Sequence, residues 1–267
     1  MPIPFLAIPG ALVIGFTLGL LGSGGSILTV PVLIYMLGQE DKVAIASSLA
    51  IVGIISLFGS ISYIKQKLID WRMVFYFGVP GVVGTYFGAW GSVLVSGTAQ
   101  LAIFAAVMLV AAIMMVKPGQ DSVDVDSCDE DGNDESAEQH PNLTLIMIEG
   151  LGVGILTGFV GVGGGFLIVP ALVLFAGISM HNAIATSLVI ISMKSLAGFA
   201  KYMDVLIDVE IDFTVIALFS AIGFFGCVLG GYVAPRIPQE QLKRGFCFVL
   251  IVMGAFIFYR TIPTLLA

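Results

Sequence analysis

The sequence predicts an all-α polytopic membrane protein made of two inverted-topology repeats of about five helical elements each, with a glycine-broken helical hairpin in each repeat. Of its 267 residues, 58% are hydrophobic and only 11% are charged, and the mean hydropathy is +1.06. Soluble domains are roughly half apolar and a quarter charged. The apolar runs are each about 17 to 25 residues long, which is the length that a bilayer-spanning helix needs. The two halves also resemble each other.

The apolar runs give the expected helices in chain order. The first transmembrane repeat, residues 1–117, should hold helices at 3–21, 26–38, 43–66, 72–95 and 98–117. The second, residues 142–267, should hold helices at 143–160, 165–177, 181–203, 211–234 and 240–261. Between them, residues 118–141 carry nine of the eighteen acids and no hydrophobic periodicity. This segment is predicted to be an acidic disordered linker, because it cannot bury enough apolar surface to become ordered.

An internal duplication relates the halves. GLLGSGGSILTVPVLIYMLG (Gly19 to Gly38) aligns without gaps on GFVGVGGGFLIVPALVLFAG (Gly158 to Gly177). At the same offset, AIASSL (Ala44 to Leu49) matches AIATSL (Ala183 to Leu188). Chance similarity between apolar helices would not place the glycines and the proline identically, so the repeat is genuine.

Basic residues in the short loops predict the orientation of each repeat. The loop at 65–72 holds Lys65, Lys67 and Arg72 and is expected in the cytoplasm. In the second half, the basic residues cluster one loop later, at 236–244. This change of side requires an odd number of crossings in each half, and therefore inverted repeats with both termini outside. In that architecture, binding sites lie near the membrane midplane between the halves.

The two glycine clusters are the first candidate site. Each precedes a helix of about twelve residues, which spans only about 18 Å and should therefore begin partway through the bilayer. Its free N–H groups and positive dipole end would suit an anion. Irregular backbone at that depth also requires protein or a water-filled cavity around it. The alternative is that the glycines only allow close helix packing. The candidate substrate-binding residues of these clusters are Gly22, Ser23, Gly24, Gly25, Ser26, Gly161, Gly163, Gly164 and Gly165.

Five polar side chains complete the candidate site. Lys194 lies in the middle of the apolar segment SLVIISMKSLAGFA, where the first repeat has Ile55. A charge at that depth is costly and usually faces a transport pathway, unless the side chain reaches the interface by snorkelling. Four hydroxyls occupy matching repeat positions, where they could line a cavity or bond to their own helix. They are Ser47, Ser48, Thr186 and Ser187.

Other classes of function find little support. The formal charge is −7, but the balance outside the linker is 11 basic minus 9 acidic residues, or +2. No basic patch with interleaved aromatics indicates a nucleic-acid partner. Two histidines and three widely spaced cysteines offer no metal cluster or thiol pair, and no catalytic constellation is evident. We therefore expect no enzymatic activity, no cofactor and no metal site.

The duplicated glycine and proline motifs, the AIASSL and AIATSL pair and the polar connection resemble the TauE/SafE family over nearly the whole chain. The resemblance implies a prokaryotic inner or plasma membrane protein that exports sulfite or a small organosulfur anion, driven by an ion gradient. The expectation is thus a secondary transporter with a midplane site and alternating access. Its expected partners are a small sulfur-containing anion, the lipid bilayer, a coupling proton or cation, and a second copy in a homo-oligomer. Two alternatives stay open: a transporter or channel for another small anion, and a non-transport membrane assembly subunit.

Overall fold

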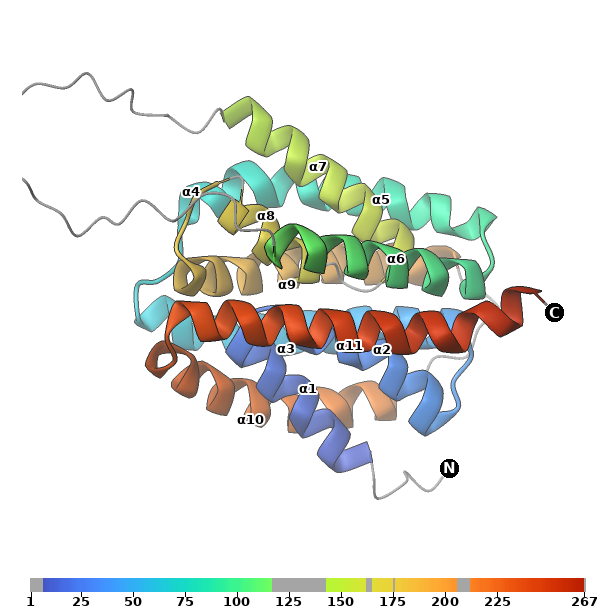
Figure 1. Cartoon of the computed structure of the whole chain (residues 1–267). Helices are drawn as coiled ribbons and strands as arrows, with labels where there is room; N and C mark the ends of the chain where they lie inside the picture. Colours follow the sequence, from blue (N-terminus) through green and yellow to red (C-terminus); the bar gives the residue numbers. More distant parts are fainter. Residues whose placement is uncertain (1–6, 117–142, 162–164, 175, 206–211, 267) are drawn as a thin grey trace, which may run out of the picture.

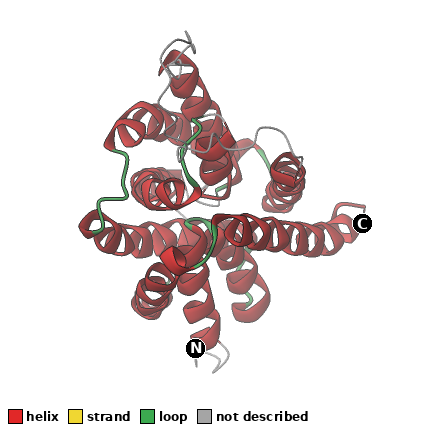
Figure 2. Ribbon diagram, turned by 60° about the vertical axis from the view of Figure 1, so that its left-hand side comes forward, coloured by secondary structure: helices red, strands yellow, loops and turns green. Residues whose placement is uncertain are grey.

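The computed structural model describes residues 7–116, 143–161, 165–174, 176–205 and 212–266. Within these ranges every regular element is a helix, and no strand occurs (Figure 2). Six of the helices are long and apolar enough to cross a membrane. The predicted all-α polytopic membrane fold is therefore confirmed. The predicted linker at 118–141 lies outside the described residues.

The helices follow the predicted order in both repeats. The first repeat contains α1 (Ala7–Leu21), α2 (Gly24–Leu37), α3 (Asp41–Lys65), α4 (Trp71–Met73), the π-helical turn η1 (Val74–Gly78), α5 (Val79–Gly91), the 3-10 turn η2 (Ser92–Leu94) and α6 (Gly97–Val116). The second contains α7 (Leu143–Val160), α8 (Gly165–Leu174), α9 (Met180–Val205), α10 (Phe213–Val233), the 3-10 turn η3 (Ala234–Arg236) and α11 (Gln239–Leu266). Most predicted boundaries agree within a few residues, but α8 ends earlier and α11 later than predicted.

One predicted helix contains an irregular turn. The sequence predicts a helix over 72–95, and the chain is helical there, with the π-helical turn η1 between α4 and α5. Pro80 lies in the first turn of α5 and has no N–H for the carbonyl of Tyr76, so the hydrogen-bond ladder has to shift at this point. In the second repeat, Ile222 occupies the position of Pro80, and α10 runs without a break.

One aspartate precedes the fourth helical segment in each repeat. The carboxylate of Asp70 accepts hydrogen bonds from the amides of Arg72 and Met73. Asp212, 142 residues later, accepts equivalent bonds from Thr214 at 2.8 Å and Val215 at 3.4 Å. Both are N-caps that satisfy otherwise unpaired amides. The Thr214 amide lowers the pKa of Asp212, because it stabilises the ionised carboxylate.

The repeats exchange elements, so two bundles form that do not coincide with them. Helix α7 of the second repeat packs along α5 of the first, and α1 of the first packs along α10 of the second. The "α7 bundle" thus contains α5 to α9, and the "α1 bundle" contains α1 to α3, α10 and α11 (Figure 1). The pairs α3 with α9 and α6 with α11 join the two bundles.

Glycines allow the closest helix contacts in both bundles. A Cβ atom at Gly15 of α1 would collide with the backbone of Gly223 in α10. A Cβ atom at Gly154 of α7 would collide in the same way with the backbone of Gly81 in α5. Small residues let backbones approach this closely in membranes. For these glycines, close helix packing is the role that the structure assigns.

Helices α3 and α9 are repeat equivalents that run antiparallel. Gly53 of α3 lies beside Ser195 and Leu196, whereas Leu49, earlier in α3, lies beside Gly198, later in α9. Equivalent helices that run in opposite directions are what an inverted repeat requires. The orientation of the repeats across a membrane stays a prediction, which this antiparallel pair supports.

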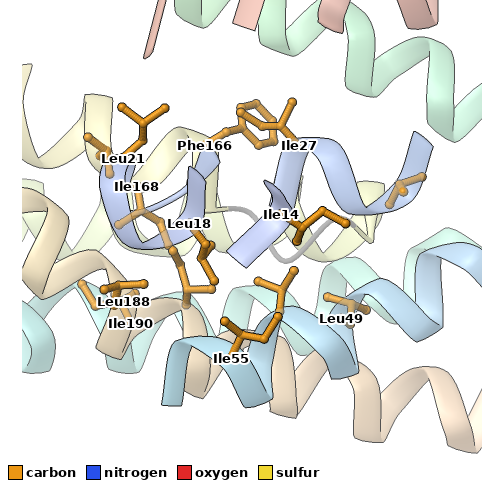
Figure 3. Packing of buried hydrophobic residues seen from close by; sticks show 14 of the residues in the cluster. Ile14, Leu18, Leu21, Ile27, Leu49, Ile55, Phe166, Ile168, Leu188 and Ile190 are labelled. Atoms are coloured by element: carbon orange, nitrogen blue, oxygen red, sulfur yellow. The ribbon is translucent and has the colours of Figure 1, made fainter. Parts of the chain in front are cut away.

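The core lies where the two bundles meet. Figure 3 shows Ile14 and Leu18 of α1 facing the same interior as Leu188 and Ile190 of α9, all buried. Phe166 of α8 lies there next to Ile27 of α2. The first residues of both short helices are therefore surrounded by protein.

Candidate functional site

The short helices α2 and α8 begin inside the protein because a glycine ends the helix before each. Gly22 and Gly161 both have φ +72°, a conformation that glycine adopts without strain. Each donates its amide to the helix that it ends, Gly22 to Leu18 O and Gly161 to Thr157 O, both at 2.9 Å. The predicted breaks are therefore real, and the same backbone geometry occurs at matching positions of the two repeats.

The N-termini of α2 and α8 meet at the bundle interface. Ser23 directly precedes α2 and is fully buried, and a Cβ atom on Gly165, the first residue of α8, would lie only 3.1 Å from the Ser23 Cβ. The first amides of an α-helix have no acceptor within the helix, and they carry the positive end of its dipole. Two such ends lie next to each other here, and the dipole of each favours a negative charge.

Ser23 and Ser26 complete the turn before α2. Ser26 donates to the Ser23 carbonyl through its hydroxyl at 2.7 Å and through its amide at 3.2 Å. The Ser23 hydroxyl has no hydrogen-bond partner among the described residues. A buried hydroxyl without a partner is costly, so Ser23 is the free polar group at the meeting point of the two helix ends.

The remaining glycines of the clusters have different surroundings. Gly24 is the first residue of α2, and a Cβ atom on Gly25 would lie 2.6 Å from the Leu18 Cβ. Gly25 thus serves the packing of α1 on α2. Gly163 and Gly164 lie outside the described residues.

The paired hydroxyls of α3 and α9 lie near the glycine turns of the opposite repeat. Ser187 donates to Ile184 O at 2.8 Å and approaches Gly22 O at 3.3 Å. Ser48 donates to Ile45 O at 2.7 Å, and the Ile45 side chain packs on Gly161. Each turn is therefore held by the third helix of the other repeat.

Ser47 and Thr186 differ although they are repeat equivalents. The Thr186 hydroxyl accepts a hydrogen bond from the Asp70 amide at 3.0 Å, which attaches α9 to the connection that follows α3. The Ser47 hydroxyl is buried and has no partner within the described ranges. Thr186 thus has a structural bond that Ser47 lacks.

Lys194 is fully buried in the middle of α9. It lies fourteen residues after Met180, or about 21 Å along a helix. Its ammonium has no hydrogen-bond partner in the described part of the chain and lies 6.0 Å from the centre of the Phe77 ring. The aliphatic stem runs against Gly81, where a Cβ atom would be 3.2 Å from the Lys194 Cδ. The ammonium therefore lies inside the protein and does not snorkel to an interface.

The repeat equivalent of Lys194 serves as an internal comparison. Ile55 packs against Gly223 just as Lys194 packs against Gly81. The equivalent position is therefore filled by an apolar side chain in one repeat, so packing against the glycine does not require a charge. The charge belongs to the α7 bundle alone.

Two tyrosines tie the glycine turns to the long helices, and their role was not predicted. The Tyr63 hydroxyl donates to Gly19 O at 2.6 Å, and the Tyr202 hydroxyl donates to Gly158 O at 3.5 Å. Both acceptor carbonyls lie in the last turn of a helix that ends in the core. Carbonyls in that turn have no hydrogen-bond partner within the helix. The matching of Tyr63 with Tyr202 in the duplication was the signal that could have revealed them.

An apolar hollow of about 260 Å³ lies between α1 and α2, lined by Pro9, Gly10, Val13, Ile14, Leu28, Val32 and Met36. Its lining offers no charged side chain, so it does not suit an anion.

Sequence comparisons find relatives that match nearly the whole chain. The family model described as "Sulfite exporter TauE/SafE" matches residues 7–257. A "Probable membrane transporter protein" of Xylella fastidiosa (strain 9a5c) is 30% identical, over 95% of this chain and 94% of its own length. The "Probable membrane transporter protein MJ0441" of Methanocaldococcus jannaschii is 28% identical, over 94% of this chain and 95% of its own. No solved structure gives a significant match. The chain therefore belongs to the TauE/SafE family.

Proposed function

We propose that this membrane transporter is a secondary carrier that exports sulfite or a related small sulfur-containing anion. The anion would bind where the N-termini of α2 and α8 meet. Membership of a family described as sulfite exporters supports the substrate class. The relatives named as probable membrane transporters support transport over enzymatic activity.

One observation carries the proposal: two helix N-termini meet in the core beside a buried hydroxyl that has no partner in the described structure. The helix ends and Ser23 offer hydrogen-bond donors, and Lys194 brings a positive charge to the interior of the same bundle pair. A compact oxyanion can accept hydrogen bonds from such donors, whereas a cation would be repelled by the helix ends and by the ammonium.

The basic residues support the proposed orientation. Thr186 meets Asp70, and Met180 meets Gln239, so these connections share one end of the molecule. Six basic residues lie near that end: Lys65, Lys67, Arg72, Arg236, Lys243 and Arg244. Three lie toward the other end: Lys42, Lys201 and Arg260. By the positive-inside rule, the first end faces the cytoplasm. The N-terminal end of α1 and the C-terminal end of α11 would then lie outside the cell.

The two-bundle construction supports alternating access. The bundles meet along α3 with α9 and α6 with α11, and α2 and α8 contribute one helix end each to the site. Rocking of one bundle against the other would expose the site to one side at a time.

Sulfite counterflow in proteoliposomes tests the function. The wild-type protein should exchange labelled external sulfite for unlabelled internal sulfite, with weak competition by sulfate and chloride. Ser23→Ala removes one donor to a charged ligand and should lower apparent affinity roughly 10-fold or more.

Ser220→Ala is the matched control. Ser220 is also buried and without a partner among the described residues, but it lies in α10, away from the two short helices. Its variant should exchange sulfite like the wild type. Conductance without counterflow would indicate a channel, and the absence of any anion flux from folded protein would favour an assembly subunit.

A further inference from the structure

The side-chain amide of Gln100 has a hydrogen-bonded nitrogen and an oxygen without a described partner. It is 1% exposed, and its Nε2 donates to Ser92 O at 3.2 Å and to Phe159 O at 3.0 Å. Its Oε1 is buried and has no partner among the residues that the structure describes. Because both donor bonds fix the amide, the free oxygen has a defined direction. A buried acceptor of this kind calls for a ligand or an ordered water.

Other oxygens surround this amide. Tyr202 is 3% exposed, and its hydroxyl lies beside the Ser92 and Gln100 side chains as well as 3.5 Å from Gly158 O. The Ser92 hydroxyl uses its proton on Ala89 O at 2.7 Å, so its lone pairs remain available. The side chains of Gln100, Ser92 and Tyr202 and the Gly158 carbonyl thus lie close together.

The cluster lies at the C-terminal end of α7. That helix ends at Val160, before Gly161, so its last carbonyls carry the negative end of the helix dipole. The dipole and the oxygens both favour a cation. The nearby ammonium of Lys201 is already paired with Asp204 at 3.1 Å.

The second bundle shows that the fold does not require these polar groups. At the same positions, 142 residues later, Ala234 replaces Ser92 and Leu242 replaces Gln100. The backbone is equivalent, since Val95 N bonds Ser92 O at 3.3 Å and Ile237 N bonds Ala234 O at 3.2 Å. Polar side chains therefore surround Tyr202 in the α7 bundle, whereas apolar ones occupy the same places in the α1 bundle.

The ligand set indicates the kind of cation. Its oxygens are an amide, two hydroxyls and a carbonyl, all neutral. Calcium and magnesium sites in proteins rely on carboxylates, so neutral oxygens suit a monovalent hard cation. Unwound or terminal helix carbonyls bind Na⁺ in several transporter folds.

We propose that Gln100, Ser92, Tyr202 and the Gly158 carbonyl form a Na⁺ site at the end of α7. Binding of Na⁺ does not depend on the proposed transport function. The role of the site does rest on that function, because we propose that Na⁺ binding is coupled to anion export. Occupied, it links α6 and α9 to the glycine turn that precedes α8. Binding of Na⁺ and the position of the α8 N-terminus are thus linked.

Thermal unfolding of the purified full chain in detergent tests binding without transport. NaCl at about 300 mM, compared with choline chloride at the same ionic strength, should raise the midpoint by about 4 to 8 °C if Na⁺ is roughly thirty-fold above its Kd. Gln100→Leu places here the side chain that the other bundle already carries, so it should fold and lose the shift. Leu242→Met is the matched control and should keep it. Equal midpoints in Na⁺ and choline for the wild type, or an unchanged shift in Gln100→Leu, would overturn the site.

Proteoliposomes test the coupling separately. A Na⁺ gradient should drive wild-type sulfite accumulation at least several-fold above choline, and Gln100→Leu should lose this stimulation but keep gradient-free counterflow. Counterflow without any Na⁺ effect overturns the coupling site and leaves the proposed function standing. The opposite result is an unfolding midpoint that rises in Na⁺ for a protein that transports no sulfur anion. That result would support the Na⁺ site and contradict the proposed function.

Discussion

Replacement of Lys194 by Met should make the protein more stable and less active. Met has nearly the length of Lys without its charge, so the stem can still fill the space beside Gly81. A lysine at the centre of a membrane helix costs roughly 2.5 to 3.5 kcal/mol. Among the described residues no hydrogen bond offsets that cost at the buried ammonium, and the Phe77 ring 6.0 Å away offsets it in part. Removing the charge should recover most of it. At about 2 to 4 °C per kcal/mol, the unfolding midpoint should rise by about 5 to 10 °C.

Activity should change in the opposite direction. If the Lys194 ammonium donates a hydrogen bond to the bound anion, its removal forfeits about 1.5 to 3 kcal/mol, and sulfite binding should weaken roughly 10- to 150-fold. The assays are thermal unfolding in detergent and sulfite counterflow in proteoliposomes, on the same preparations. Gains in stability with losses of function are typical of residues kept for activity.

Ile55→Met is the matched control, because Ile55 is the equivalent residue in the α1 bundle. It changes a well-packed side chain without removing charge, and should cost less than about 1.5 kcal/mol with normal counterflow. If Lys194→Met instead lowers stability and leaves transport intact, Lys194 is a structural residue and the reasoning about its charge is wrong.

Three further outcomes test a glycine contact, a tyrosine hydrogen bond and a helix cap. Gly154→Ala should destabilise the chain by about 1 to 3 kcal/mol or prevent its assembly, whereas Gly152→Ala, with open space around it in the same helix, should be neutral or stabilising by up to about 1 kcal/mol; size-exclusion profiles and unfolding midpoints distinguish them. Tyr63→Phe leaves Gly19 O unpaired and should lower stability by about 1 to 3 kcal/mol in thermal unfolding, and an unchanged midpoint would show that the bond contributes nothing. Because the folded pKa of Asp212 is lowered from 3.8, its stabilisation is present above that pH and lost as the pH falls through the folded value. Unfolding between pH 3 and 6 should therefore be less pH-dependent in Asp212→Asn, and equal pH profiles would refute this.

The helices and the two breaks could be predicted because the sequence repeats them. Gly22 and Gly161 recur at one offset, and both adopt the left-handed conformation that ends a helix. Apolar runs of the right length gave the spans. The π-helical turn η1 was not predicted, because it depends on Pro80, which the second repeat lacks.

The partners of the helices could not be predicted. Helices α1 and α7 are apolar on all sides, so their sequences do not indicate which neighbour each packs against. The free oxygen of Gln100 was missed for a similar reason. Only the structure reveals that the Gln100 amide nitrogen donates to the carbonyls of Ser92 and Phe159, and that its oxygen has no described partner.

The exchange of α1 and α7 between the repeats bears on how such a chain could arise and be synthesised. The glycine face of α5 stays uncovered until α7 emerges from the ribosome, so the first repeat alone cannot complete its own packing. A half-length ancestor would have met the same difficulty, and a second copy offering its first helix would have solved it. Fusion of two such chains keeps that swapped arm and removes the concentration dependence of the assembly. Fusion also leaves each copy free to change separately, which is consistent with a lysine and a glutamine in one bundle where the other has an isoleucine and a leucine.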